Sequence, residues 1–361
     1  MNRVISLRLS SILGLVILFS IGLHAQDEPN FQLAYEYLRN RDICLINMDG
    51  TGNTCLTDTD DVIEHNPIWS PDGQILTYSS VDEPVSQSVY KTYLYDVATK
   101  TAIQFPKPWN ILSWSADSET ILAMNRDDRQ LYNLSRDGSK QERLTFDSTS
   151  NFHASWSPNG QEFVYLSGYP KTSLRIMPDS GGSYRVLNDT LDIDGFVAPQ
   201  WSPDGQTIAF SAYDGEQPSS GDISEIYIVQ SDGSNLRQLT FTDGINWEPR
   251  WSPDGKQLIF WGSASGAFDD MGSTTSLRTE VFHINADGSN LVNLTQSTGL
   301  DYQPEWSPDG QWIAFASTRQ GPGIYIMRPD GSDIQMVTNE PPFSEGGRES
   351  NNPVWRPVGG G

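Results

Sequence analysis

A five-residue motif, Trp-Ser-Pro-Asp-Gly, recurs along this chain and limits what the chain can fold into. The copies share their tryptophan, and they begin at Trp69, Trp114, Trp156, Trp201, Trp251, Trp306 and Trp355. The copies at Trp69, Trp201, Trp251 and Trp306 are intact, and the others are weaker. One tryptophan follows another at intervals of 42 to 55 residues. Self-similarity at this period indicates a repeat architecture.

One repeat contains four short β-strand signals joined by turns. In residues 249–295, Trp251 ends the first strand, and β-rich runs follow at 257–261, 280–284 and 291–295. In the connecting Ser-Pro-Asp-Gly turns, proline presets φ, aspartate bonds to the backbone and glycine supplies the left-handed residue. No long run of helical period interrupts the pattern. A four-stranded unit of this length, repeated around an axis, is typical of a β-propeller blade.

The number of repeats predicts how the ring closes. Complete four-strand sets are predicted near residues 67–104, 112–145, 154–187, 199–240, 249–295 and 304–338. Residues 32–57 resemble the three outer strands of a blade, and residues 352–358 resemble the missing inner strand. Joining them covers strand edges that would otherwise pair with other chains. We therefore predict an all-β fold, a seven-bladed propeller of antiparallel blades within a single domain, residues 26–361. Six blades with loose ends is the alternative.

The N-terminus has the pattern of a secretory signal peptide. Arg3 and Arg8 precede an apolar run at 12–23, and Ala25 offers a small residue for cleavage. We expect residues 1–25 to be removed and the protein to be exported, to the periplasm or outside the cell, with no membrane attachment after cleavage. A retained anchor is the alternative, although spanning needs about 20 apolar residues. No cysteine follows the run, which argues against a lipoprotein anchor.

The charge of the chain excludes one class of partner. The full sequence has a net charge of −23, and removing residues 1–25 leaves 21 basic residues against 46 acidic, or −25. Such a chain repels phosphate backbones, so we expect no nucleic-acid partner. Solubility alone explains the charge. A basic partner or a bound cation is the functional alternative.

The two cysteines of the chain, Cys44 and Cys55, flank a turn signal at residues 47–51. Antiparallel pairing about that turn would place them on neighbouring strands. An exported chain permits a disulfide between them, but cross-strand geometry is often poor for the bond. The alternative is a pair of small buried hydrophobic residues.

The variable face of the propeller is the expected site of function. Short turns occupy one face, whereas longer loops diversify the other, where function usually lies. The positions four residues before each tryptophan, with their neighbours, are expected to encircle the mouth of the central channel. The candidate ligand-binding residues are His65, Trp109, Phe152, His153, Trp247, Glu248, Tyr302, Gln303 and Asn351. Such a ring suits a peptide or a sugar, although its aromatics could instead pack against loops. The repeat tryptophans themselves are expected to pack between blades.

The motif Pro-x-Trp-Ser-Pro-Asp-Gly, followed by runs such as Ile-Ala-Phe, Ile-Tyr-Ile-Met, Asp-Gly-Ser and Leu-Thr, resembles the TolB-like propeller repeat over residues 32–358. The resemblance implies a protein-interaction platform in the bacterial cell envelope. We expect a monomer that binds a protein or peptide, with a glycan as the alternative ligand. Similar repeats also form the propellers of dipeptidyl peptidase-type enzymes and of an oligogalacturonate lyase. TolB carries an additional N-terminal α/β domain, for which residues 26–31 leave no room. We therefore expect a propeller without that domain.

Catalytic signals in the sequence are weak. His65, His153 and His283 follow the signal peptide, and the first two hold matching places in different blades. With Glu64 or Glu248 they could hold a metal, as the resemblance to the lyase implies. No His-x-x-His spacing and no Gly-x-Ser-x-Gly motif occurs. We expect no catalytic residue, no metal site and no cofactor. A lyase or hydrolase with a metal at the channel mouth is the alternative, and a rigid spacer in an envelope assembly is a third possibility.

Overall fold

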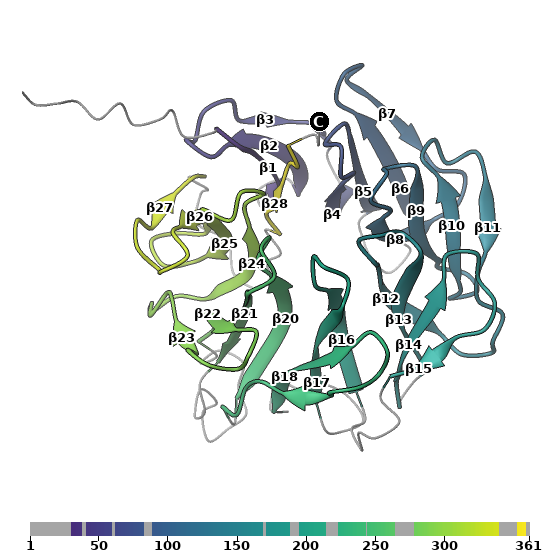
Figure 1. Cartoon of the computed structure of the whole chain (residues 1–361). Helices are drawn as coiled ribbons and strands as arrows, with labels where there is room; N and C mark the ends of the chain where they lie inside the picture. The colour runs from purple at the N-terminus through teal and green to yellow at the C-terminus, as the bar shows by residue number, and fades with distance from the viewer. Residues whose placement is uncertain are drawn as a thin grey trace, which may run out of the picture. The chain divides into compact units, whose positions relative to one another are not determined.

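Seven sheets, each of four antiparallel strands, are arranged in a ring (Figure 1). The computed structural model describes residues 30–37, 41–59, 62–82, 89–168, 171–187, 195–213, 223–242, 244–263, 278–338 and 352–358. The ring belongs to the unit Phe31–Gly361, and Met1–Asn30 is a separate unit. The predicted signal peptide lies outside the described residues. Within those residues, no helix is long and apolar enough to cross a bilayer.

Six blades follow one another along the chain, each running from an inner to an outer strand. Blades 1 to 3 consist of β4 (Val62–Trp69), β5 (Ile75–Asp82), β6 (Tyr90–Asp96) and β7 (Thr101–Gln104); β8 (Trp109–Trp114), β9 (Thr120–Asn125), β10 (Leu131–Ser135) and β11 (Gln141–Arg143); and β12 (Asn151–Trp156), β13 (Glu162–Ser167), β14 (Ser173–Pro178) and β15 (Arg185–Val186). Blades 4 to 6 consist of β16 (Gly195–Trp201), β17 (Thr207–Tyr213), β18 (Ser224–Gln230) and β19 (Arg237–Gln238); β20 (Ile245–Trp251), β21 (Gln257–Ser263), β22 (Glu280–Asn285) and β23 (Val292–Asn293); and β24 (Asp301–Trp306), β25 (Ile313–Ser317), β26 (Gly323–Met327) and β27 (Gln335–Met336). The inner strands begin three to five residues before their predicted starts, because each continues through an irregularity described below.

The seventh blade is built from both ends of the ring. It consists of β1 (Gln32–Tyr37), β2 (Asp42–Asn47) and β3 (Thr54–Cys55), with β28 (Val354–Trp355) as its inner strand. Leu33 of β1 pairs with Trp355, and Ala34 pairs with Val354. Figure 1 shows β28 beside β1, between blades 6 and 1. The prediction of seven blades is confirmed, and the six-blade alternative is wrong.

The recurrent Ser-Pro-Asp-Gly motif, with its weaker copies, forms the turn that leads out of the inner strand in blades 1 to 6. In blade 1 the amide of Gly73 donates to the carbonyl of Ser70 at 2.8 Å, and Gly73 has a φ of 65°. The Ser70 hydroxyl donates to Oδ1 of Asp72 and accepts the amide of Ile75. Serine and aspartate therefore satisfy the backbone of the turn, and glycine supplies its left-handed conformation.

The core of the ring consists of seven hydrophobic clusters, one between each pair of neighbouring blades. Each repeat tryptophan packs against the preceding blade. The indoles of Trp201, Trp251, Trp306 and Trp355 each donate a hydrogen bond to the carbonyl just before the preceding tryptophan, for example from Trp355 to Glu305 at 3.1 Å. The indole nitrogens of Trp69, Trp114 and Trp156 are buried without such a partner. The repeat tryptophans thus join blades, as the sequence predicts.

A disulfide joins Cys44 and Cys55, which lie directly opposite each other on β2 and β3. Cys44 is fully buried, whereas Cys55 is exposed. Of the two alternatives that the sequence leaves open, the structure therefore has the bond.

Candidate functional site

Each inner strand of blades 1 to 6 carries a shift of register in the four residues before its tryptophan. In five blades, the residue three places before the tryptophan has a positive φ: Asn66 (58°), His153 (47°), Ala198 (50°), Glu248 (55°) and Gln303 (50°). Residues other than glycine rarely adopt this conformation, and such strain clusters at functional sites. A β-bulge re-aims the side chain that it contains. Here the bulges turn one side chain per blade towards the channel.

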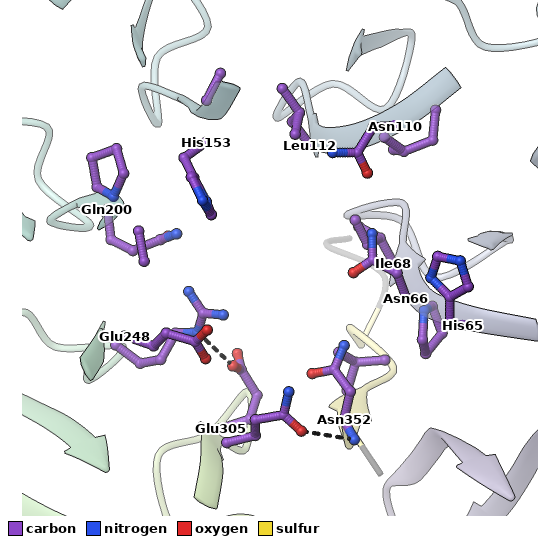
Figure 2. Close-up of a pocket in the computed structure, with 18 of the residues that line it drawn as sticks. His65, Asn66, Ile68, Asn110, Leu112, His153, Gln200, Glu248, Glu305 and Asn352 are labelled. Carbon is purple, nitrogen blue, oxygen red and sulfur yellow. Dashed lines mark hydrogen bonds and ion pairs between the residues drawn. The ribbon is translucent and has the colours of Figure 1, made fainter. Parts of the chain in front are cut away.

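These side chains line a cavity of about 680 Å³ at the centre of the ring (Figure 2). All seven blades contribute to it. The lining residues are Glu36, His65, Asn66, Pro67, Ile68, Asn110, Ile111, Leu112, His153, Ala154, Ala198, Pro199, Gln200, Glu248, Arg250, Gln303, Glu305, Asn352 and Val354. Most lie three residues or one residue before a repeat tryptophan. The lining is rich in amides and carboxylates, so it can both donate and accept hydrogen bonds.

Four of the predicted ring residues line this cavity: His65, His153, Glu248 and Gln303. Their side chains project from blades 1, 3, 5 and 6, so residues far apart in the sequence meet at one site. The side-chain Oε1 of Gln303 also accepts the amide of Asn352 at 3.1 Å, linking blade 6 to the closing strand (Figure 2). Asn351 lies outside the described residues.

None of the four predicted aromatic residues lines the cavity, and each packs against neighbouring side chains instead, which corrects their expected placement. Trp109 is 2% exposed and packs on Tyr132 at 5.1 Å. Phe152 and Tyr302 pack against the clusters of their own blades, and Trp247 lies 5.7 Å from Trp261. Side chains along an inner strand alternate between two faces that neighbouring blades cover. The bulge breaks this alternation, so the residues three before and one before the tryptophan face the channel and the aromatic residues do not.

Glu248, Arg250 and Glu305 form the charged part of the wall. Nε of Arg250 lies 3.1 Å from Oε2 of Glu305, across the junction of blades 5 and 6 (Figure 2). Oε2 of Glu248 accepts a hydrogen bond from Nε1 of Trp261 at 3.3 Å. Burial raises the pKa of Glu305, Arg250 opposes this rise, and the nearby charge of Glu248 adds to it. The guanidinium of Arg250 therefore pairs with Glu305, whereas Glu248 is bonded by the indole of Trp261.

The two histidines of the cavity are neutral at pH 7. Burial lowers the pKa of His65 to about 4, and the positive charge of Arg126 contributes to this decrease. Burial within the channel also lowers the pKa of His153, and the nearby Glu248 opposes this effect only in part. Neutral imidazoles can accept hydrogen bonds or bind metals. Among the described residues, however, no group of three or more His, Cys, Asp or Glu side chains is placed to hold a metal ion.

The remaining predicted ligand of a metal, Glu64, and the third histidine, His283, lie elsewhere. Glu64 is buried and accepts hydrogen bonds from Thr57 and Thr59 at the junction of blades 7 and 1. His283 lies on β22, with its ring beside Asn290 and the carbonyl of Pro329. Neither residue lines the cavity.

The sequence contains a signal for the lining residues that the prediction missed, among them Asn66, Gln200, Arg250 and Glu305. A proline lies two residues before five of the seven repeat tryptophans, at Pro67, Pro199, Pro249, Pro304 and Pro353. Proline lacks an amide hydrogen, so within sheets it is confined to edges and bulges. The first four of these prolines lie within a bulge, and the residues on either side of all five line the channel.

A seven-bladed propeller with a polar cavity on its axis is the class of protein that this fold and site define. An uncharacterised protein of Agrobacterium fabrum is 23% identical over 268 residues, 71% of this chain and 84% of that protein. A TolB homologue of Chlorobium luteolum is 28% identical over 147 residues, 40% of this chain and 31% of that protein. An uncharacterised peptidase of Bacillus subtilis is 27% identical over 145 residues, 33% of this chain and 21% of the peptidase. No protein-family model matches the chain.

Solved structures with the same fold include two described as TolB. A putative TolB from Agrobacterium tumefaciens has a TM-score of 0.52 at 21% identity, covering 69% of this chain and 88% of that one. TolB from Acinetobacter baumannii has a TM-score of 0.54 at 18% identity, covering 90% of this chain and 66% of that one. An oligogalacturonate lyase in complex with manganese has a TM-score of 0.58 at 15% identity, covering 85% of each. At these identities the likeness concerns the fold alone. In fold, the chain is a TolB-like β-propeller protein.

Proposed function

We propose that this propeller is exported and binds a segment of another protein in its channel cavity, without catalysing a reaction. The observation that carries the proposal is the recurrence of bulges that turn side chains from separate blades into one cavity. The resulting wall presents amides at Asn66, Gln200, Gln303 and Asn352. An amide both donates and accepts hydrogen bonds, as a peptide group does, so this wall is complementary to an extended chain.

The size of the cavity indicates what it can hold. A volume of about 680 Å³ lies within the range of pockets that enclose a small ligand, roughly 300 to 1,000 Å³. It therefore suits a few residues of peptide rather than a folded domain. The resemblance to TolB and the signal-peptide pattern support a protein partner met outside the cytosol.

Blocking the cavity tests this proposal. Ala198 lines the cavity, and its replacement by tryptophan would fill much of the space. Thr101 is exposed on the outer strand β7, so Thr101→Trp is the matched control. Peptides that bind the wild-type protein are selected from a displayed library of random sequences. Their affinities for the wild type and for both variants are then measured by titration. We expect Ala198→Trp to abolish binding and Thr101→Trp to retain it. Equal binding to the wild type and both variants would refute a channel site.

A second candidate is a metal-dependent lyase, which the fold likeness to the manganese-bound oligogalacturonate lyase favours. Its test is incubation with oligogalacturonate and Mn²⁺, following the ultraviolet absorbance of the unsaturated product. The binding proposal predicts no turnover. Turnover that disappears in His153→Gln would replace the binding proposal with the lyase.

A further inference from the structure

We infer that the segment bound in the channel cavity carries a lysine or arginine side chain, which lies against Glu248 and Glu305. The inference rests on the proposed function, because it names the chemistry of the segment that the cavity holds. Three properties of the wall carry it: its charge, its unfilled hydrogen-bond acceptors and the position of its single guanidinium.

The described lining residues carry more negative than positive charge. Their carboxylates belong to Glu36, Glu248 and Glu305, and their one guanidinium belongs to Arg250. His65 and His153 have lowered pKa values and add no positive charge at pH 7. A positively charged ligand would therefore neutralise the excess negative charge of this wall.

The excess negative charge is concentrated on one side of the cavity. The carboxylate of Glu36 already accepts the amide of Asn66 at 2.8 Å, on the blade 1 side. The guanidinium of Arg126, which affects His65, stacks over Tyr90 at 4.0 Å between blades 1 and 2. Figure 2 shows Glu248 and His65 on opposite sides of the cavity. A ligand cation is thus directed towards the Glu248 side.

Glu248 and Glu305 retain the means to bind such a cation. Their Oε2 atoms accept hydrogen bonds from Trp261 and Arg250, respectively. No donor among the described residues reaches Oε1 of either side chain. A carboxylate offers about four acceptor positions, so an ammonium or guanidinium group could bond to both glutamates. Hydrogen bonds between two charged groups are about twice as strong as neutral ones.

The same two carboxylates also disfavour a negatively charged ligand. Glu248 lies close enough to Glu305 for the two negative charges to oppose each other. An acidic side chain placed beside them would add a third negative charge, and such like-charge contacts provide specificity against wrong partners. The net charge of the whole chain, −23, acts in the same direction, because it accelerates the encounter with cationic segments.

Peptide pools that differ at one position test the inference. Short acetylated, amidated peptides of Ser, Gly and Ala carry Lys, Arg, norleucine or Glu at the centre, and fluorescence polarisation measures their affinity for the folded chain. EDTA is present, so that no bound metal contributes. We expect Lys and Arg pools to bind about 10- to 100-fold more tightly than the norleucine pool. The double variant Glu248→Gln with Glu305→Gln should lose this preference. Glu142→Gln, an exposed carboxylate on β11, is the control.

The outcomes separate the inference from the proposed function. Equal binding of Lys and norleucine pools would overturn the inference and leave the proposed function in place. Absence of binding by every pool, together with failure of the random library, would overturn both. A preference for Lys that persists in the double variant would place the cation away from Glu248 and Glu305, and would also overturn the assignment.

Discussion

Arg250 and Glu305 join neighbouring blades across the wall of the channel, with Nε of the first 3.1 Å from Oε2 of the second. Each is the residue immediately before a repeat tryptophan, so the two lie at the same level of the ring. The repeat that builds the fold therefore also places the charges of the site. Changes at this pair alter the charge of the wall while the blades around it remain packed.

Replacing Arg250 with Gln should lower the free energy of unfolding by about 1 kcal/mol at pH 7, because the charged form of Glu305 loses the cation that stabilises it. Both side chains are about a third exposed, so solvent screening keeps the effect small. The loss should shrink at pH 5, since burial raises the pKa of Glu305 and protonation removes the unpaired charge. Urea denaturation at the two pH values measures both effects. Losses of equal size at pH 5 and pH 7 would show that the charge of Glu305 is not the cause.

Truncating Trp355 should open the joint between the two ends of the ring. This side chain is 6% exposed, packs in the cluster between blades 6 and 7, and donates to the carbonyl of Glu305. Trp355→Ala should lower the free energy of unfolding by about 3 to 5 kcal/mol. Trp355→Phe, which keeps a ring but loses the indole N–H, should have a smaller effect. Denaturation measures both variants, and the exposed Val358→Ala is the control. An unchanged stability in Trp355→Ala would contradict closure by β28.

Glu64 should make stability depend on pH in an unusual direction. Burial raises its pKa from 4.5 to about 7, and the nearby Asp42 contributes to the rise. The folded protein therefore retains a proton that the unfolded chain releases above about pH 4.5. The contribution of Glu64 is full below that pH and is lost as the pH rises through 7, a change of about 2 to 3 kcal/mol.

Glu64→Gln tests this pH dependence. The amide has nearly the same shape but cannot ionise, so the variant should lack the loss of stability between pH 5 and pH 8. Parallel denaturation series of the wild type and the variant across that range provide the comparison. If the two curves stay parallel, the proton does not reside on Glu64.

The disulfide between Cys44 and Cys55 should stabilise the closing blade. It closes a short loop, with a sequence separation of 11. Reduction should therefore lower the free energy of unfolding by about 2 to 3 kcal/mol in the loop-entropy description. Cys55→Ser changes the exposed partner and leaves the buried one in place, so it should match the reduced wild type. Identical stability of oxidised protein and variant would contradict the expected contribution.

The sequence predicts the architecture well because the repeat is periodic. Each Trp-Ser-Pro-Asp-Gly copy forms one turn and one contact between blades, so counting to Trp355 predicts the blades and their closure. The prediction of the site is less accurate because it places the residue four before each tryptophan, with its neighbours, at the channel mouth. A β-bulge in the inner strand instead turns the residue three before the tryptophan to the channel, so Asn66 reaches the channel while Trp109 and Tyr302 pack between blades. The prolines two residues before the tryptophans carry that information, but only the register of the folded strands shows its effect.

Pairing of charges across blades is harder to predict from the sequence. Arg250 and Glu305 lie 55 residues apart, and nothing local to either residue indicates its partner. Their contact depends on the ring bringing adjacent inner strands to the same level. The same holds for Asp42 and Glu64. Their carboxylates both contact the hydroxyl of Thr57, and this contact exists only where blade 7 meets blade 1.

The central claim is that a peptide segment occupies the channel cavity, and cross-linking tests it most directly. A selected peptide carrying a photoreactive diazirine is bound to the wild-type protein and irradiated, and the attachment sites are identified by mass spectrometry. The account predicts cross-links to the cavity wall, at residues such as Gln200, Gln303 and Asn352, and their loss in Ala198→Trp. Cross-links confined to the outer strands, such as β7 and β11, would contradict it.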